Sequence, residues 1–248
     1  MNGARGLAGR LAEHVAGLLF PPQCAGCGRE VSNPGTVCGR CWSRLRFIER
    51  PYCAVMGTPF AHDLGENFLS AEAIADPPPF QRARAAVGHD GIPRRMIVGL
   101  KYHDQTNLAP WMAQWMLRAG GELIADCDVI LPVPLHAFRF WSRRFNQAAE
   151  LARAVAALAD KPFEPEALKR VKRTRQQVGL AATERQRNVS GAFRVPNDQE
   201  IKIRGRSILL VDDVYTTGAT VKAATRALLR AHAASVDVLT FSRVLPEI

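Results

Sequence analysis

The chain has 248 residues, of which 47% are apolar, and this is enough for one sizeable domain and a small appendage. No apolar stretch approaches the roughly 20 residues of a membrane span, so we expect no stable membrane insertion. The formal net charge of +10 indicates a partner that carries phosphate groups, either a nucleic acid or a small anion.

The first 20 residues place apolar side chains at helical spacing, but charged residues interrupt them. A signal peptide would need an uninterrupted apolar core, so this segment does not resemble one. We predict a short amphipathic helix that packs on the rest of the protein, and binding to a membrane surface is the alternative. Because no targeting segment is recognised, the expected location is the cytoplasm.

Two CxxC pairs follow, Cys24-Ala-Gly-Cys27 and Cys38-Gly-Arg-Cys41. Four thiolates at this spacing satisfy tetrahedral Zn²⁺, so we predict one structural zinc site, a small zinc ribbon. A pair of disulfides is one alternative, although it requires an oxidising compartment and nothing here directs the chain to one. A redox-active CxxC is the other alternative.

The segment Cys53-Ala-Val-Met56-Gly-Thr-Pro59 resembles the start of a second ribbon in which Met56 replaces a thiol. No further CxxC follows, and His62 is only a weak additional ligand for Cys53. We therefore predict a metal-free remnant held by packing. The helix and ribbon are expected within residues 1–60, and a larger domain is expected at 80–248 after a proline-rich joint.

Predicted strands and helices alternate in the larger domain, which is typical of a mostly parallel α/β sheet. In chain order they are a strand at 83–89, helices at 92–100 and 108–118, a strand from 128 that ends near 131, a helix at 145–158, a strand at 207–211, a helix at 219–230 and a strand at 236–243. Trp111 and Trp115 share one helix face and are expected in the core. Cys127 is also expected there, and Asn146 is a possible helix cap.

The most informative segment is a strand followed by two acids and a turn. The apolar run 208–211 predicts a strand buried on both faces, and Asp212 and Asp213 close it. Residues 216–218 then form a tight turn before the helix at 219–230. Ligands of open α/β sheets bind at the carboxyl ends of strands, and a helix N-terminus suits a phosphate. Since paired acids can accept hydrogen bonds from vicinal hydroxyls, the segment predicts a sugar-phosphate site. A plain strand-turn-helix with two solvated acids is the alternative.

This segment resembles the signature of type I phosphoribosyltransferases and implies their mostly parallel α/β sheet. By that resemblance, the candidate catalytic pair Asp212 and Asp213 holds the ribose hydroxyls of phosphoribosyl pyrophosphate (PRPP). The candidate loop for its 5′-phosphate consists of Thr216, Thr217, Gly218, Ala219 and Thr220.

Further landmarks in chain order make the whole sequence resemble the ComF family. They are the ribbon 24–41, the segments 99–102, 133–136 and 144–147, Gln177 with Leu180, Arg187 with Asn188, and the loop 212–220. This family joins a double zinc ribbon to a phosphoribosyltransferase domain and is associated with DNA uptake in natural transformation. Two departures are the lost ligands of the second ribbon and Arg144, where the family often has glycine.

The resemblance implies transfer of a phosphoribosyl group from PRPP, with Mg²⁺ held largely by pyrophosphate and ribose oxygens. The candidates for binding pyrophosphate are Lys101, His136, Arg139 and Arg143. The basic stretch 172–188 corresponds to the hood loop of the family, in which the candidates are Gln177, Arg187 and Asn188. Solvated surface charge is the alternative for both groups. The sequence shows neither the acceptor nor the general base.

A second hypothesis is a binding module without catalysis. In it, the ribbon and the basic loop hold single-stranded DNA or a helicase partner, and the PRPP pocket senses a metabolite or is vestigial. Aromatic and arginine side chains interleave at 138–144, a pattern that fits stacking on single strands, although packing on the ribbon would also explain it. Nucleobase salvage is a third hypothesis, but the zinc ribbon has no evident use there. The sequence does not predict the oligomeric state.

Overall fold

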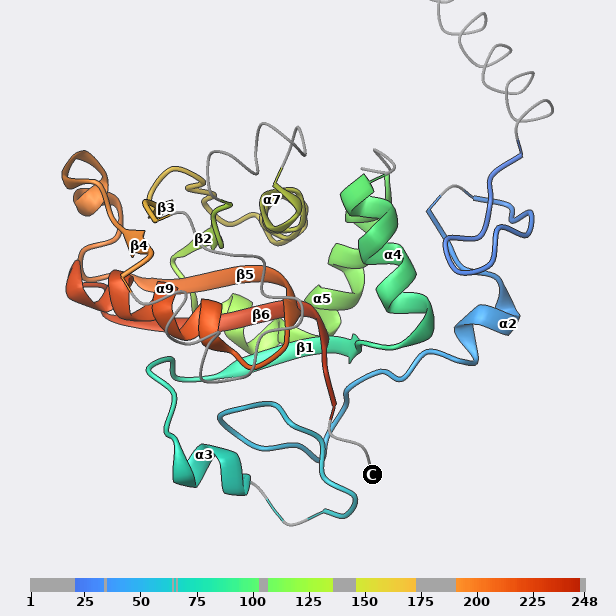
Figure 1. The fold of residues 1–248 in the computed structure, drawn as a ribbon, viewed down its shortest axis with the longest axis horizontal. Coiled ribbons are helices and arrows are strands. Elements are labelled where there is room, and N and C mark those ends of the chain that lie inside the picture. Colours follow the sequence, from blue (N-terminus) through green and yellow to red (C-terminus); the bar gives the residue numbers. More distant parts are fainter. Residues whose placement is uncertain are drawn as a thin grey trace, which may run out of the picture.

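The computed structural model of the chain describes residues 21–33, 35–63, 65, 67–102, 107–135, 146–172 and 191–245 (Figure 1). Within these residues, four parallel strands form the main sheet, in the order β1 (Ala83–Gly88), β6 (Ser235–Arg243), β5 (Ser207–Tyr215) and β2 (Val129–Pro132). This topology confirms the predicted mostly parallel sheet. The helix expected at residues 1–20 lies outside the described residues.

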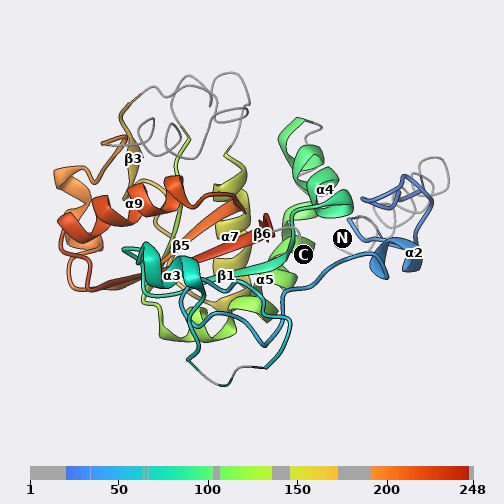
Figure 2. The same ribbon diagram turned by 60° about the horizontal axis from the view of Figure 1, so that its bottom comes forward.

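Helices cover both faces of the sheet (Figure 1, Figure 2). They are α9 (Ala219–Arg230) on one face, α5 (Leu108–Asp126) and α7 (Gln147–Ala159) on the other, and α4 (Gly91–Tyr102) beside α5. Ile208 and Leu210 of β5 pack on the α9 side, whereas Leu209 and Val211 pack on the opposite side. Successive residues of a strand point to opposite faces, so a strand covered on both sides must be apolar throughout.

The strand β5 is longer than its sequence predicts. The predicted end was Val211, but the strand continues to Tyr215, and Asp212 and Asp213 lie within it. Pairing with β6 keeps this part of the backbone extended, with Asp212 opposite Thr240. The apolar pattern could not show this extension because the partner strand, and not the side chains, maintains it.

The helix α5 also extends beyond its predicted end, from Arg118 to Asp126. Within the helix, Gly120 leaves helical geometry, with φ −113° and ψ 18°, and the helix continues after it as a kink. A Cβ placed on Gly120 would lie 2.7 Å from a methyl carbon of Leu239 in β6. The glycine therefore allows the helix to approach the sheet closely, and it does not end the helix.

This close approach predicts opposite effects for two adjacent substitutions. Gly120→Ala should lower the free energy of unfolding by about 1–3 kcal/mol, because the new methyl group overpacks the core against Leu239. Gly121→Ala meets no atom within 4 Å and should raise the same free energy by about 0.5–1 kcal/mol, because alanine favours a helix. Urea unfolding of the two variants measures both effects. Stabilisation by both substitutions would contradict the packing explanation.

Short elements flank the sheet. They are α2 (Gly39–Trp42), α3 (Ala71–Ala75), β3 (Lys169–Arg170), β4 (Phe193–Arg194) and the 3₁₀ helix η1 (Asn197–Lys202). β3 and β4 form an antiparallel pair. Among the helices that the structure describes, none is long and apolar enough to cross a membrane.

Aromatic side chains join the cysteine ribbon to the sheet domain. Trp115 of α5 lies 5.6 Å from Trp42 and 5.4 Å from Phe47, measured between ring centroids, and it stacks on Phe241 of β6 at 5.8 Å. Trp111 contacts the ribbon too, since a Cβ on Gly35 would lie 2.4 Å from its ring. Both tryptophans are half-buried and not in the core as predicted, because they pack between the ribbon and the sheet domain.

Candidate functional site

The two acids lie in the middle of the sheet, near its carboxyl edge. β5 has β6 on one side and β2 on the other; Asp212 pairs with Thr240 of β6, whereas the pairing with β2 ends at Val211, just before the acids. Both residues are half-buried, and the amide of Asp213 donates to the Asp212 carboxylate at 2.9 Å. This is the edge at which ligands of parallel sheets bind.

The turn after β5 is built around a glycine. Gly218 has φ +71°, a left-handed conformation that disfavours other residues, and it forms the N-cap of α9. A Cβ on Gly218 would lie only 2.2 Å from the Tyr215 hydroxyl oxygen, so the Tyr215 ring directly supports the turn. Thr216 is exposed and Thr217 is half-buried. The predicted loop therefore begins at the carboxyl end of β5 and ends in the first turn of α9.

The start of α9 has the features of an anion site. No described side chain caps the helix, and its first turn contains no acidic residue. The hydroxyl oxygen of Thr217 is buried and has no hydrogen-bond partner among the described residues. The positive end of the helix dipole favours a negatively charged group, and a phosphate would also provide an acceptor for the Thr217 hydroxyl.

The carboxyl end of β2 is bonded to β5 just before the acid pair. The amide of Val133 donates to the Val211 carbonyl at 2.8 Å. Asn146 donates from its side chain to the Val133 carbonyl at 3.1 Å, and its side-chain oxygen accepts from the amide of Ala148 at 3.2 Å, which confirms the predicted helix cap. Asn146 thus fixes both ends of the loop between β2 and α7.

Several predicted site residues lie where the structure gives no side-chain geometry. Lys101 is in α4, but its side chain is not described. The predicted residues outside the described ranges are His136, Arg139, Arg143, Gln177, Arg187 and Asn188. Their roles stay predictions. What the structure does show is the base of the predicted hood, where the amide of Val171 donates to the Ala192 carbonyl at 2.8 Å.

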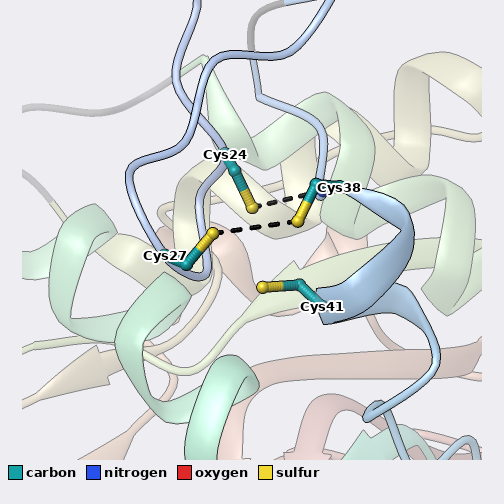
Figure 3. A group of neighbouring side chains, drawn as sticks. All are labelled: Cys24, Cys27, Cys38 and Cys41. Carbon is teal, nitrogen blue, oxygen red and sulfur yellow. Dashed lines mark hydrogen bonds between the residues drawn. The ribbon is translucent and has the colours of Figure 1, made fainter.

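The four ribbon cysteines, Cys24, Cys27, Cys38 and Cys41, come together as predicted (Figure 3). Their sulfur atoms all lie within 4.8 Å of one another, and those of Cys27 and Cys38 are 3.7 Å apart. The amides of Cys38 and Gly26 donate to the Cys24 sulfur at 3.2 and 3.4 Å, and such bonds orient a metal ligand. Four sulfurs from two knuckles match the closed tetrahedral geometry of structural zinc.

The pKa values of these thiols also fit a bound cation. Burial raises the pKa of Cys24, but hydrogen bonds from the amides of Cys38 and Gly26 outweigh burial and lower it to about 6. Burial and contact with the other three thiols raise the pKa of Cys41 to about 12. Near neutral pH, the Cys41 thiol would therefore lose its proton only beside a cation, and zinc deprotonates the thiols that coordinate it.

The segment around Cys53 repeats the backbone of the knuckle around Cys24. In the first knuckle, the amide of Gly28 donates to the Cys24 carbonyl at 2.9 Å, and in the second the amide of Gly57 donates to the Cys53 carbonyl at 2.8 Å. Both glycines have positive φ, 72° and 64° respectively. The equivalence places Met56 where the first knuckle has its second thiol, as the sequence predicted.

The second half of this ribbon can also be located. The amide of Ser70 donates to the Cys53 sulfur at 3.2 Å, as the amide of Cys38 does to its ribbon sulfur. Ser70 precedes α3 as Cys38 precedes α2, which places Ala73 where the first ribbon has Cys41. The four equivalent positions are occupied by Cys53, Met56, Ser70 and Ala73. Only one of them can supply a thiolate.

Sequence reasoning did not single out three residues that surround the loop. Tyr215 lies under Gly218, and burial raises its pKa to about 12, so its hydroxyl stays neutral. Arg243 and Lys222 are buried charged residues on β6 and α9. A charged residue at the end of an apolar strand was the available signal for Arg243, but only the fold shows what it contacts.

Two family models match the chain. A model of the double zinc ribbon domain matches residues 15–73, and a model of the phosphoribosyl transferase domain matches residues 146–244. The DNA utilization protein YhgH of Escherichia coli strain K12 is 31% identical over 216 residues, which cover 84% of this chain and 91% of that protein. The chain belongs to the ComF family.

A further relative and a solved structure also match the chain. Competence protein F of Haemophilus influenzae is 27% identical over 230 residues, which cover 89% of this ComF-family chain and 90% of that protein. An orotate phosphoribosyltransferase structure from Aeropyrum pernix matches with a TM-score of 0.31 and 17% identity, and covers 64% of this chain and 80% of the other. The ribbon match ends at residue 73, the last of the four positions in the second ribbon.

The cysteine geometry predicts a single zinc ion per chain by metal analysis of the purified protein. Cys38→Ser should lose the zinc and lower the free energy of unfolding by at least about 2 kcal/mol, because coordination stabilises the folded ribbon. Cys53→Ser is the matched control and should keep the zinc content of the unmodified protein. Two zinc ions per chain, or loss of zinc from the control, would contradict the assignment of ligands.

Proposed function

We propose that this chain binds PRPP at the carboxyl end of β5 and transfers its phosphoribosyl group to an acceptor. The supporting observation is the order of groups along one short segment. Asp212 and Asp213 are followed by a turn at Gly218 and by a helix whose first turn carries no acid and no described side-chain cap. In this proposal the acids accept hydrogen bonds from the ribose hydroxyls, and residues 216–220 bind the 5′-phosphate.

The proposed reaction breaks the bond between ribose C1 and the pyrophosphate oxygen. The electron pair leaves with pyrophosphate, C1 gains positive charge, and a nucleophile of the acceptor then forms the new bond to C1. Positive side chains would stabilise the departing charge, and the candidates remain Lys101, His136, Arg139 and Arg143. Mg²⁺ would be held mainly by oxygens of the substrate, as this ion prefers.

The hood loop would exclude water from this reaction. Its described ends are joined by the β3–β4 pair, which places the start and the end of the segment side by side. In the proposal Gln177, Arg187 and Asn188 close over PRPP, and closure protects the reactive sugar cation from water. PRPP is a cytoplasmic metabolite, so the proposal also places the protein in the cytoplasm.

The second candidate function is binding of single-stranded DNA or of a helicase partner. It is favoured by the arginines Arg29, Arg40 and Arg44, which are exposed and line a hollow next to Cys27 and Cys41. Two relatives are named for DNA utilization and competence, and this link to DNA comes to the chain through them. Binding through phosphates would weaken steeply between low and moderate salt. The two functions are compatible, since they use different parts of the chain.

Thermal unfolding of the zinc-loaded protein with Mg²⁺ and PRPP tests the first proposal. PRPP at a hundred times its dissociation constant should stabilise the protein by about 2.7 kcal/mol, a rise of roughly 5–10 °C in the unfolding midpoint. Asp212→Asn/Asp213→Asn should lose this rise. Asp198→Asn/Glu200→Gln removes the same charge from η1 and should keep it.

The outcomes separate binding from transfer. No rise with millimolar PRPP in the unmodified protein would overturn the PRPP proposal and leave the DNA-binding candidate. A rise in the unmodified protein that the acid variant lacks would support the site, and release of pyrophosphate on addition of candidate nucleobases would then test transfer. Loss of the rise in the η1 control would show that overall charge, and not the two acids, controls binding.

A further inference from the structure

The second ribbon packs into the buried apolar cluster that also contains residues on both sides of the turn after β5. Cys53, Met56 and Ala73 belong to the same buried apolar cluster as Tyr215 and Ala219. The ribbon is also bonded to the sheet, because the amide of Ala83 donates to the Val55 carbonyl at 2.7 Å. The part of the chain that lost its metal ligands therefore packs beside the proposed phosphate loop.

Arg243 is the main polar link between the two parts. It ends β6 opposite Tyr215 and is almost completely buried. Its guanidinium group donates to the carbonyl of Met56, lies 3.7 Å from the Glu72 carboxylate and stands over the Tyr215 ring, with its central carbon 4.4 Å from the ring centroid. Burial of a charge is costly unless partners offset it, and most of the partners of Arg243 come from the second ribbon and its helix α3.

Tyr215 carries this link to the loop. Its ring lies between Arg243 and Gly218, and the hydroxyl is in such close contact with Gly218 that no side chain would fit there. Phe80 packs edge-on against the same ring, with 6.5 Å between the centroids. A shift of Arg243 would therefore move Tyr215 and, with it, the floor of the turn.

A second link reaches the first turns of α9. The Lys222 ammonium group donates to the Asp76 carboxylate at 2.7 Å, and Asp76 follows α3 of the second ribbon. Lys222 is buried, while Asp76 is largely exposed. The amide of Lys222 donates to the Gly218 carbonyl at 2.8 Å, so the Asp76–Lys222 pair is connected to the turn through the backbone of Lys222. Through it, Lys222 lowers the pKa of the Asp76 carboxyl.

We infer that the second ribbon acts as a brace that sets the conformation of the phosphate loop at residues 216–220. Arg243 is its positioning residue, and the Asp76–Lys222 pair is its second contact. In this role the ribbon has exchanged a metal site for packing against the loop. The effect on PRPP rests on the proposed function, whereas the effect on the loop itself does not.

Two measurements on the full zinc-loaded chain test the brace. Hydrogen exchange without ligand reports the order of the amides at 216–220, and titration calorimetry with Mg²⁺ and PRPP reports affinity. Arg243→Met should speed exchange of these amides and weaken PRPP binding, each by about tenfold. Asp76→Asn, at an exposed position that preserves the core, should change both in the same direction by about threefold.

Arg82→Met is the matched control at the opposite end of the sheet. The Arg82 guanidinium group pairs with Asp237 at 2.5 Å and with Asp126 at 2.9 Å, away from the loop. This variant should lower the free energy of unfolding and leave loop exchange and PRPP affinity unchanged. A merely structural role of Arg243 would give that same result.

The results separate the brace from the proposed function. The brace is overturned if Asp76→Asn and every folded Arg243 variant keep the loop exchange of the unmodified protein. If the unmodified protein binds no PRPP, the proposed function fails, but faster loop exchange in the two variants would still support the brace. Faster exchange with unchanged PRPP affinity would overturn the claim that the brace serves phosphate binding.

Discussion

The parallel pairing of β5 with β6 on one side and β2 on the other is the constraint on which the rest of the structure depends. It places β5 inside the sheet, where helices cover both faces and the strand is apolar up to Val211, and the pairing with β6 keeps the backbone extended through the two acids to Tyr215. Each neighbouring strand then ends at the same edge as the acids. The helix caps, the turn and the buried arginine are all arranged around that edge.

The two ribbons show how one backbone can be held together in two ways. In the first, four sulfurs converge within the reach of one metal ion. In the second, the same amide-to-sulfur and glycine-to-carbonyl bonds survive around Cys53, while Met56 and Ala73 fill the centre with apolar atoms. In the second ribbon, burial of a methionine and an alanine takes the place of metal coordination.

Local patterns predicted most of the fold and the centre of the candidate site. Residues close together in sequence were enough to predict four features: the buried strand at 208–211, the acid pair, the turn at Gly218 and the zinc ribbon. Features that depend on contacts between distant segments were not predicted. Gly120 lies close to Leu239 of β6, the bond from Ser70 to Cys53 shows its place in the second ribbon, and Arg243 contacts Met56 and Glu72, which are far away in the chain.

The aromatic contacts between the first ribbon and the sheet domain, called here the aromatic seam, affect the fluorescence of the protein. Trp42 directly follows the ribbon residue Cys41, its ring lies 5.6 Å from Trp115, and Trp115 stacks on Phe241 two residues before Arg243. With Trp111 against Gly35, three of the chain's four tryptophans line this seam. The emission of an indole ring depends on its immediate surroundings. The intrinsic fluorescence of the unlabelled protein therefore reports chiefly on the contact between the first ribbon and the sheet domain.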